Sequence, residues 1–321
     1  MSADLRKYTQ PHVAICIATF MRPQGLKALI QSLNAQVIRD RLAWVTLVIV
    51  DNAPDALAEQ TLGDIQDLTH WPVIYAVEPT RGIVAARNRC LAKVPADADY
   101  IAFLDDDESV SETWLEEMLG TIALPDTVAV QGPVEPKFRQ PPPGWVEALS
   151  LFRMGPYNQG ARINSAATNN SMVDADVVRK LGLRFDPRFN ITGGEDEEFY
   201  TRLRESGGTI RAAAQALVWD DVPESRTTLR WIGRRWFRKG NTLGRIALIR
   251  RQGVAMRVVK GVGAIGWGCL TCLCLGFGSR SRWYRGVLEV YRGAGMLAAL
   301  AHVEFAEYSS SAVAADRPGG H

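Results

Sequence analysis

The stretch that decides the fold is Tyr100–Glu108, Y-I-A-F-L-D-D-D-E, in which five apolar or aromatic residues run directly into four consecutive carboxylates. The apolar run is too short for a helix and is typical of a buried β-strand. Adjacent carboxylates repel one another, and a bound divalent cation relieves that repulsion. The stretch therefore predicts a strand that ends at a site for a divalent metal and a phosphate-bearing substrate. A solvated acidic loop is the alternative.

Three similar apolar runs precede this one, at His12–Thr19, Val45–Val50 and Val73–Val77. Helical patterns lie between them, as after Pro23, where apolar residues recur at helical spacing. Strands that alternate with helices predict an α/β fold, a mixed and mostly parallel sheet with helices on both faces. Ligands bind such sheets at the carboxyl ends of the strands. The residues expected at those ends are Thr19, Asp51, Arg81 and Asp105 to Asp107.

Further patterns follow the acidic stretch. Thr113-x-x-Glu116 predicts a capping box at the start of a helix. Pro133–Gly144 contains five prolines, which predicts a loop without regular structure beside the cleft. In Thr192–Phe199, two glycines predict a tight turn that brings Glu195 and Asp196 to the first turn of a helix. Simple capping of that helix is the alternative role for these two carboxylates.

The charge is divided unevenly along the chain. Met1–Glu224 carries 21 basic and 31 acidic residues, whereas Ser225–Leu288 carries 14 basic residues and no acidic one. Such a division indicates two surfaces that meet two different partners. We therefore expect a main α/β domain over 1–224, a basic and apolar helical extension over 225–308, and a disordered tail over 309–321.

The extension combines basic and apolar patterns. Arg230, Arg234 and Arg238 recur every four residues, which places them along one side of a helix. Gly261–Ser279 is uncharged, and about 19 residues at ~1.5 Å each barely span a bilayer core. With the amphipathic Val287–Val303, it predicts a helix pair lying in the membrane interface, with the basic band against anionic lipid.

The five cysteines are an odd number in a long chain, which argues against a disulfide framework and fits a reducing compartment. Cys269-x-x-Cys272-x-Cys274 lies in an apolar run without nearby His or acidic ligands. We therefore predict small buried hydrophobes there instead of a metal cluster. The polar stretch Met1–Pro11 lacks the apolar centre of a signal peptide.

Five motifs now stand in one order along the chain. They are Ala18-Thr19-Phe20-x-Arg22, Val50-Asp51-Asn52, Arg81-Gly82-x-x-x-Ala86-Arg87-Asn88, Leu104-Asp105-Asp106-Asp107 and Gly193-Gly194-Glu195-Asp196-x-Glu198-Phe199. This order resembles family 2 glycosyltransferases with the GT-A fold, over about Val13–Asn241. Within the family it is most similar to bacterial exopolysaccharide glucosyltransferases of the succinoglycan type, which also carry an Arg-rich segment and an apolar C-terminal region.

The resemblance implies an inverting transfer of a sugar, expected to be glucose, from a UDP-sugar donor. By match to the family motifs, the nucleotide-sugar-binding residues are Thr19, Arg22, Asp51, Arg81, Gly82, Arg87, Asp105 and Asp106, with Asp51 facing the uracil. Mg²⁺ or Mn²⁺ would be held by Asp107 and Asp105 and would neutralise the diphosphate leaving group. Asp220 and Asp221 both stay open as the third ligand.

An inverting displacement also needs a base that accepts a proton from the acceptor hydroxyl. Asp196 stands at the family's position for that base, and Glu195 would orient the acceptor. The Q-x-x-R-W element of processive synthases is absent, although Arg230-Trp231 and Arg235-Trp236 each offer an Arg-Trp pair. The sequence therefore predicts the addition of a single sugar.

The acceptor expected from the resemblance is a polyprenyl-diphosphate-linked saccharide in the synthesis of exopolysaccharide or another cell-surface glycan. The residues expected to bind its diphosphate are Arg230, Arg235, Trp236 and Arg238. The expected location is the cytoplasmic face of the bacterial inner membrane, peripheral or monotopic, with an anionic membrane surface as partner and no nucleic acid.

Two other functions are compatible with parts of the sequence. Asp105-x-Asp107 has the spacing of a phosphohydrolase motif, but that nucleophile normally follows the first strand, whereas here a nucleotide-binding half precedes it. A non-enzymatic, membrane-attached binding protein would use the arginines and tryptophans after Arg226. It leaves the acidic strand ends and the Gly193-Gly194-Glu195-Asp196 motif unexplained.

Overall fold

The computed structural model describes residues 10–37, 43–53, 63, 65–190, 192–275 and 278–303, so the expected tail over 309–321 lies outside the described residues. The described residues fall into two compact units. The sheet unit comprises Met1–Lys137, Phe152–Asn190 and Glu195–Asp221. The helical unit comprises Phe138–Leu151, Ile191–Gly194 and Val222–His321.

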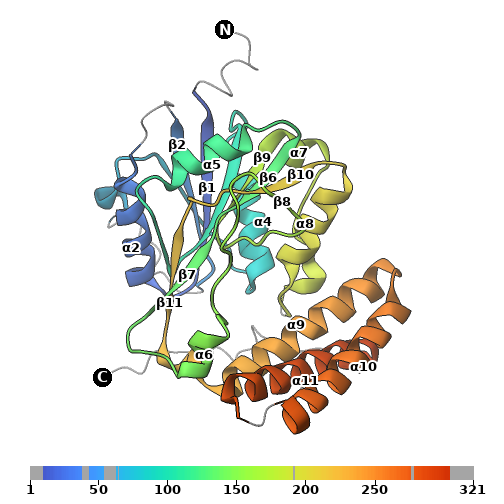
Figure 1. The fold of residues 1–321 in the computed structure, drawn as a ribbon. Helices are drawn as coiled ribbons and strands as arrows, with labels where there is room; N and C mark the ends of the chain where they lie inside the picture. The colour runs from blue at the N-terminus through green and yellow to red at the C-terminus, as the bar shows by residue number, and fades with distance from the viewer. Residues whose placement is uncertain are drawn as a thin grey trace. The chain divides into compact units, whose positions relative to one another are not determined.

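Within its described residues, the sheet unit contains an eight-stranded sheet of order β3-β2-β1-β4-β9-β6-β10-β8 (Figure 1). The strands are β1 His12–Thr19, β2 Trp44–Asp51, β3 Val73–Val77, β4 Tyr100–Asp105, β6 Thr127–Gln131, β8 Arg162–Ile163, β9 Ser171–Asp174 and β10 Thr209–Ala212. Strands β1 to β4 pair in parallel, and so do β6 and β10, whereas β9 runs antiparallel to β4 and β6. The predicted mixed, mostly parallel sheet is confirmed.

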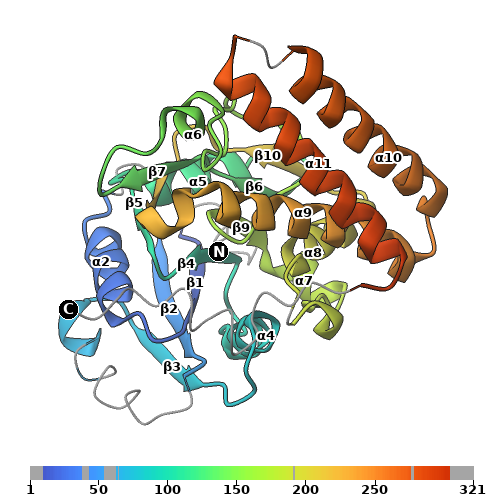
Figure 2. The same ribbon diagram turned by 90° about the horizontal axis from the view of Figure 1, so that it is seen from below.

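Helices cover both faces of this sheet, as expected (Figure 2). On one face, α2 (Pro23–Asn34) and α5 (Trp114–Ile122) bury their apolar sides against alternate strand residues such as Ile15 and Ile17. On the other face, α4 (Ile83–Lys93) packs on β1 and β2, and Phe103 of β4 meets Phe199 of α8 (Glu195–Glu205). Because the strands are buried on both faces, they are continuous apolar runs in the sequence.

A second sheet corrects one prediction. Within the described residues it has three strands in the order β5-β11-β7, which are Glu108–Val110, Val218–Val222 and Val134–Phe138. The prediction of no regular structure over Pro133–Gly144 is therefore wrong. Pro136 is tolerated because β7 lies at the edge of its sheet, where one side of the strand needs no ladder hydrogen bonds.

The predicted capping box is also absent. Thr113 precedes the first residue of α5, but its side chain makes no capping hydrogen bond. By contrast, Asp174 caps α7 (Ala175–Lys180) by accepting from the backbone N–H groups of Asp176 and Val177. The short helices η1 (Pro187–Phe189) and α8 follow α7 in the chain.

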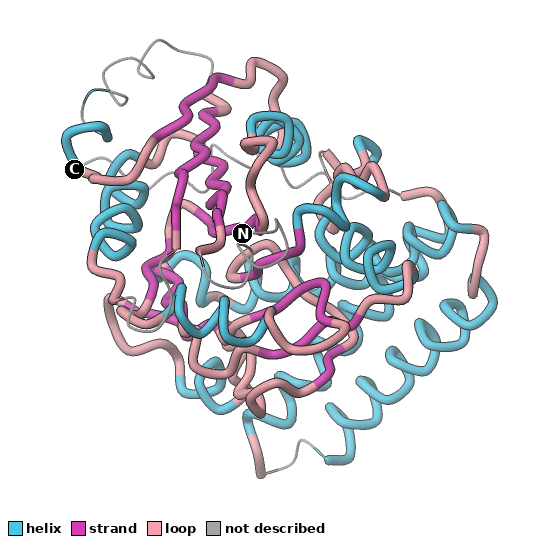
Figure 3. Tube along the Cα trace, turned by 90° about the horizontal axis from the view of Figure 1, so that it is seen from above, coloured by secondary structure: helices cyan, strands magenta, loops and turns pink. Residues whose placement is uncertain are grey.

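Long helices make up most of the helical unit (Figure 3). They are α9 (Leu229–Arg250), α10 (Val254–Leu270) and α11 (Arg280–Leu300). The unit also contains the shorter α6 (Gly144–Ala148), η2 (Glu224–Thr227) and η3 (Thr271–Leu275). Both α9 and α10 pack against α11, so the two segments predicted to pair, in α10 and α11, do lie against each other. Their location in a membrane interface stays a prediction. Glycines spaced seven apart meet across the α10–α11 contact, Gly261 with Gly293 and Gly268 with Gly286. Small residues at such contacts let two helix backbones approach closely.

Helix α10 buries only the narrow stripe that faces α11. Its exposed apolar residues, with Leu273 of η3, are Met256, Val258, Val259, Val262, Trp267 and Leu270. Within the described residues, Val254–Cys274 is the one helix long and apolar enough to cross a membrane, and most of it is not buried. This face is the main exposed apolar surface of the helical unit.

All five cysteines lie in the described part of the chain and are free thiols. Cys16 and Cys90 are buried, whereas Cys269 and Cys274 are exposed and Cys272 is half-buried. The prediction of small buried hydrophobes near 269–274 is therefore wrong for Cys269 and Cys274. Both lie in the apolar run of α10 and η3 and are exposed, so the apolar sequence around them does not imply burial.

Candidate active site

Asp105 ends β4, Asp106 and Asp107 form a turn, and Glu108 begins β5; these four residues are called the acidic turn below. Their carboxylates do not all face the same way. The side chain of Asp106 is 7% exposed, whereas those of Asp105 and Asp107 are 38% and 21% exposed. Asp106 thus points inward, whereas the side chains of Asp105 and Asp107 are partly exposed.

Asp106 gathers two of the predicted nucleotide-binding residues around it. Its Oδ2 accepts hydrogen bonds from Thr19 Oγ1 (2.8 Å) and from the backbone N–H of Phe20 (3.3 Å). Arg22 Nη1 donates to Asp106 Oδ1 (3.1 Å) and to Asp107 Oδ2 (2.7 Å). Burial raises the pKa of Asp106 to about 6, although Arg22 and Thr19 act to lower it. The structure thus brings Thr19, Arg22, Asp106 and Asp107 together.

Glu108, the last residue of the acidic turn, is buried, which the sequence did not indicate. Its Oε2 accepts the backbone N–H of Asp105 (2.8 Å), and it lies opposite Asp220 in the β5–β11 ladder. Burial raises the pKa of Glu108, and the charge of Asp105 adds to this effect. The backbone N–H of Asp221 donates to Asp107 O (3.1 Å), so β11 brings both candidates for a third metal ligand beside the turn.

Asp51, at the end of β2, is also held in place. Its Oδ1 accepts the backbone N–H of Ala53 (2.8 Å), and its Oδ2 accepts the hydroxyl of Tyr75 (3.1 Å). Burial and the charge of Asp51 raise the pKa of Tyr75, which keeps the phenol protonated as a donor. Tyr75 lies inside the Val73–Val77 run, where its aromatic character predicted a strand and gave no sign of this contact.

Asn52 shapes the loop that carries Arg81 and Gly82. Its Nδ2 donates to the carbonyls of Glu78 (2.7 Å) and Thr80 (2.8 Å), and its Oδ1 accepts the backbone N–H of Gly82 (2.8 Å). Gly82 has a φ of 132°, a conformation that side chains rarely adopt. Arg81 is exposed, with its guanidinium 5.7 Å from the centre of the Phe20 ring.

Arg87 of α4 is only 8% exposed and bridges two carboxylates. Its Nη2 donates to Asp105 Oδ1 (2.9 Å), and its Nη1 forms an ion pair with Glu195 Oε1. The guanidinium also lies 6.0 Å from the centre of the Phe185 ring. Contact of Arg87 with the nucleotide stays a prediction. In the structure, the guanidinium of Arg87 is paired with Asp105 and Glu195.

The start of α8 has the predicted local geometry. Gly193 and Gly194 both have positive φ, 71° and 92°, and Glu195 and Asp196 form the first turn of the helix. Glu195 is buried against Arg87, whereas Asp196 is half-buried and its Oδ1 accepts the backbone N–H of Glu197 (2.7 Å). The two neighbouring carboxylates thus have different surroundings, because only Glu195 is tied to an arginine by a buried ion pair.

Known proteins share this sequence pattern. Residues 14–182 match the family described as Glycosyl transferase family 2. The chain belongs to glycosyltransferase family 2. This glycosyltransferase is 31% identical over 290 residues to the succinoglycan biosynthesis protein ExoM of Rhizobium meliloti (strain 1021), covering 90% of the chain and 93% of ExoM. It is 29% identical over 271 residues to the pre-mycofactocin glycosyltransferase of Mycobacterium tuberculosis, covering 79% of the chain and 52% of that protein.

Solved structures show the same fold. The mannosyltransferase PcManGT from Pyrobaculum calidifontis, in complex with GDP-Man and Mn²⁺, superimposes with a TM-score of 0.65 at 15% identity, covering 92% of the chain and 88% of that structure. The predicted GT-A fold is therefore confirmed. The family membership also disfavours the phosphohydrolase and binding-protein alternatives.

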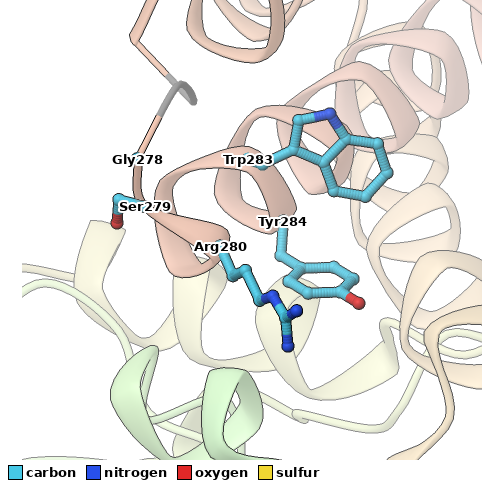
Figure 4. Close-up of a pocket in the computed structure, with 5 residues that line it drawn as sticks. All are labelled: Gly278, Ser279, Arg280, Trp283 and Tyr284. Atoms are coloured by element: carbon cyan, nitrogen blue, oxygen red, sulfur yellow. The ribbon is translucent and has the colours of Figure 1, made fainter.

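The residues that the sequence assigns to the acceptor diphosphate lie in the helical unit of this family 2 glycosyltransferase. Arg230, Arg235, Trp236 and Arg238 are all on α9. Trp236 lines a cavity of about 210 Å³ with Leu149, Leu151, Arg285, Leu288 and Glu289. A cavity of about 430 Å³ lies at the start of α11 and is lined by Gly278, Ser279, Arg280, Trp283 and Tyr284 (Figure 4). Trp145 of α6 stacks on Tyr284, with ring centres 4.2 Å apart.

The residues present fit a hard divalent cation in part. Within the described residues, no group of three or more His, Cys, Asp or Glu side chains has the arrangement of a metal site. However, the two open carboxylates of the acidic turn, Asp105 and Asp107, are oxygen donors of the kind that Mg²⁺ and Mn²⁺ prefer. Two protein carboxylates with substrate phosphates are a usual donor set for Mg²⁺, so the site suits a metal that arrives with a nucleotide.

Proposed function

We propose that this glycosyltransferase transfers one sugar, expected to be glucose, from a UDP-sugar to a polyprenyl-diphosphate-linked saccharide during exopolysaccharide synthesis. ExoM is a succinoglycan biosynthesis protein, and the likeness covers 90% of this chain. The observation that carries the proposal is the acidic turn, whose buried Asp106 binds Thr19 and Arg22 while Asp105 and Asp107 are partly exposed.

The proposed donor site uses the strand ends of the sheet unit. Asp51 would accept the imide N–H of uracil, and the hydroxyl of Tyr75 holds the carboxylate ready for it. Thr19 and Arg22 lie at the end of β1 beside the acidic turn, and exposed Arg81 follows β3. Their donors suit the ribose and the negatively charged diphosphate of a nucleotide-sugar.

Asp107 and Asp105 would hold Mg²⁺ or Mn²⁺. When bound, the ion supplies positive charge that stabilises the departing diphosphate. The relief of repulsion at the acidic turn agrees with this role, because Asp107 and Asp105 both act to raise the pKa of buried Asp106. Arg22 adds a second positive charge next to Asp107.

Asp196 is the proposed general base. In an inverting displacement, the acceptor oxygen attacks the anomeric carbon as the bond to the diphosphate breaks, and the hydroxyl proton passes to a carboxylate. Glu195 is less suited to this step, because it is buried in an ion pair with Arg87. It is the proposed orienting residue for the acceptor side of the site.

The helical unit is the proposed membrane-associated part, at the cytoplasmic face of the bacterial inner membrane. Its α10 exposes an apolar face, and Ser225–Leu288 contains 14 basic residues and no acidic one. Basic residues near an anionic surface contribute about 1 kcal/mol each, and apolar burial adds to this. The α9 arginines, with Arg235 and Arg238 among them, are the proposed contacts for the acceptor diphosphate.

The function is tested with the full chain, anionic vesicles and a lipid extract that contains polyprenyl-diphosphate-linked saccharides. Radiolabelled UDP-glucose, UDP-galactose and GDP-mannose are offered in parallel, and we expect label from a UDP-sugar in the lipid fraction. GDP-mannose is included because PcManGT was solved with GDP-Man. Transfer from GDP-mannose alone would exclude the UDP donor, and label in water-soluble glycans alone would exclude the lipid-linked acceptor.

A further inference from the structure

We propose that contacts with the segment Arg81–Asn88 position the start of α8. Arg87, Asn88 and Asn190 are then positioning residues for the carboxylates in the first turn of α8. The proposal rests on the proposed function, in which Asp196 is the base. It reassigns Arg87, which the family resemblance places at the nucleotide. Three contacts between this segment and residues 185–195 carry it.

The first contact joins Asn88 to Phe185. Asn88 Nδ2 donates to Phe185 O (2.8 Å), and Phe185 N–H donates back to Asn88 Oδ1 (2.9 Å). Because the backbone N–H and C=O of Phe185 both bond to the side chain of Asn88, the position and orientation of Phe185 relative to α4 are fixed. The Phe185 ring in turn stacks on Phe199 of α8, with ring centres 4.5 Å apart.

The second contact joins Asn190 to the beginning of α4. Asn190 Oδ1 accepts the backbone N–H of Ala85 (3.1 Å), and its Nδ2 donates to Arg81 O (2.9 Å). The side-chain oxygen thereby satisfies an N–H group in the first turn of α4. Gly82 lies directly against this amide, and a side chain at Gly82 would collide with it.

The third contact is the ion pair between Arg87 and Glu195. Both side chains are buried, so the attraction is weakly screened and the planar guanidinium fixes the direction of the carboxylate. The other end of the same guanidinium holds Asp105 of the acidic turn. Arg87 therefore ties the first residue of α8 to the strand end that carries the proposed metal ligands.

Together these contacts act at residues 185, 190 and 195, on both sides of the short helix η1 and up to the first residue of α8. The two glycines before Glu195 give the backbone freedom at that point, so the direction of α8 depends on contacts beyond the turn. Asp196 is the next residue, and a change in the first turn would move it. Misplacement of a reacting group by ~1 Å lowers rates by up to ~100-fold.

The first test is Arg87→Lys, which keeps the positive charge but replaces the guanidinium, whose two nitrogens bind two carboxylates, with a single ammonium group. We expect kcat for transfer to fall ~30-fold or more while the calorimetric Kd for UDP stays within ~3-fold of the wild type. Arg179→Lys is the control, because Arg179 of α7 also joins two groups, the Asp176 carboxylate on the same helix and the backbone carbonyl of Ala98 before β4. A UDP Kd raised ~10-fold with normal kcat at saturation would make Arg87 a nucleotide contact and overturn the proposal.

The second test uses Asn190→Ala, which leaves no buried charge unpaired and is the safer variant for folding. Hydrogen exchange should speed up at residues 199–202 in both this variant and Arg87→Lys, because their backbone amides bond to the carbonyls of the first turn of α8. Asn34→Ala is the control, because Asn34 makes a similar cross-link to Leu68 O and Thr69 elsewhere in the sheet unit. Unchanged exchange over residues 199–202 in both variants would refute the positioning role, even for a protein without measurable transfer.

A double-mutant cycle then separates this proposal from the proposed function. If Arg87 acts through Glu195, the effects of Arg87→Lys and Glu195→Gln on kcat should be strongly non-additive. Additive effects would contradict the positioning role. Full kcat in Asp196→Asn would instead remove Asp196 as the base, which is a failure of the proposed function and is read independently of the exchange data.

Discussion

The two units handle charge in different ways. In the sheet unit, carboxylates of the acidic turn are paired with arginines from distant parts of the sequence, Arg22 with Asp106 and Asp107, and Arg87 with Asp105. In the helical unit, the sequence concentrates basic residues beside an exposed apolar helix. The first arrangement organises its own charges for chemistry, whereas the second is suited to a large partner that is anionic and apolar.

The largest effect that would sharpen this comparison is expected at the acidic turn. Asp107→Ala should abolish transfer, because it removes a proposed metal ligand and a partner of Arg22. The melting temperature should not fall, since the charge of Asp107 repels buried Asp106 and Glu108. Asp67→Ala, at an exposed acidic residue outside the turn, is the control. Full activity of Asp107→Ala in the presence of a chelator would rule out the metal role.

The next effect is expected at the first turn of α8. Asp196→Asn keeps the shape of the side chain and removes its capacity to accept a proton, so kcat should fall ~100-fold or more. Binding of UDP, measured by calorimetry, should persist, because the Asp196 carboxylate is hydrogen-bonded to the backbone N–H of Glu197 within α8. A lost affinity for UDP with normal turnover at saturation would assign Asp196 to the donor site instead.

The comparison also explains what the sequence could predict. The strands β1 to β4 were predictable because each is a mostly apolar run that is followed by polar residues, and so were the acidic turn and the carboxylates of α8. The contacts that orient them were not. Arg87 meets Glu195 across 108 positions, and Ala85 meets Asn190 across 105, so no local pattern announces either pair. The burial of Glu108 depends in the same way on β11, whose sequence carries no strong strand signal.

In the helical unit, the sequence predicted a helix correctly but did not predict which residues are exposed. The apolar run of α10 correctly predicted a helix but not which side would be exposed, because glycines confine its contact with α11 to one stripe. Periodicity identifies an apolar helix, whereas the width of its buried face depends on the partner helix. That is why Cys269 and Cys274 were expected to be buried and are exposed.

A smaller effect is expected on membrane binding. Leu273→Asp places a charge on the exposed face and should weaken binding to vesicles with anionic lipid by about 10-fold or more, since burial of a Leu contributes about 1.5–3 kcal/mol. Leu181→Asp, at an exposed leucine of the sheet unit, should change nothing. High salt should weaken the binding of both variants through screening of the basic residues. Equal binding of Leu273→Asp and the wild type would show that α10 does not enter the lipid.

The smallest effect is expected on stability and separates two kinds of glycine in the helical unit. Gly293→Ala places a methyl group against the backbone oxygen of Gly261 and should destabilise the unit by about 1–3 kcal/mol. Gly263→Ala, where nothing lies within 4 Å, should instead stabilise α10 by about 0.5–1 kcal/mol. Thermal unfolding of both variants measures this contrast. The same sign of change in both would mean that the close approach of α10 and α11 does not depend on Gly293.

The placement of the cysteines allows the region around α10 and η3 to be labelled without engineering the chain. Because Cys16 and Cys90 are buried and Cys269 and Cys274 are exposed, a bulky thiol-reactive dye applied to the folded chain will label the region around α10 and η3 and spare the sheet. A polarity-sensitive fluorophore installed there needs no engineered site. Its emission would report the depth of this region in a bilayer, and quenchers placed at known depths along the lipid chains would calibrate the scale.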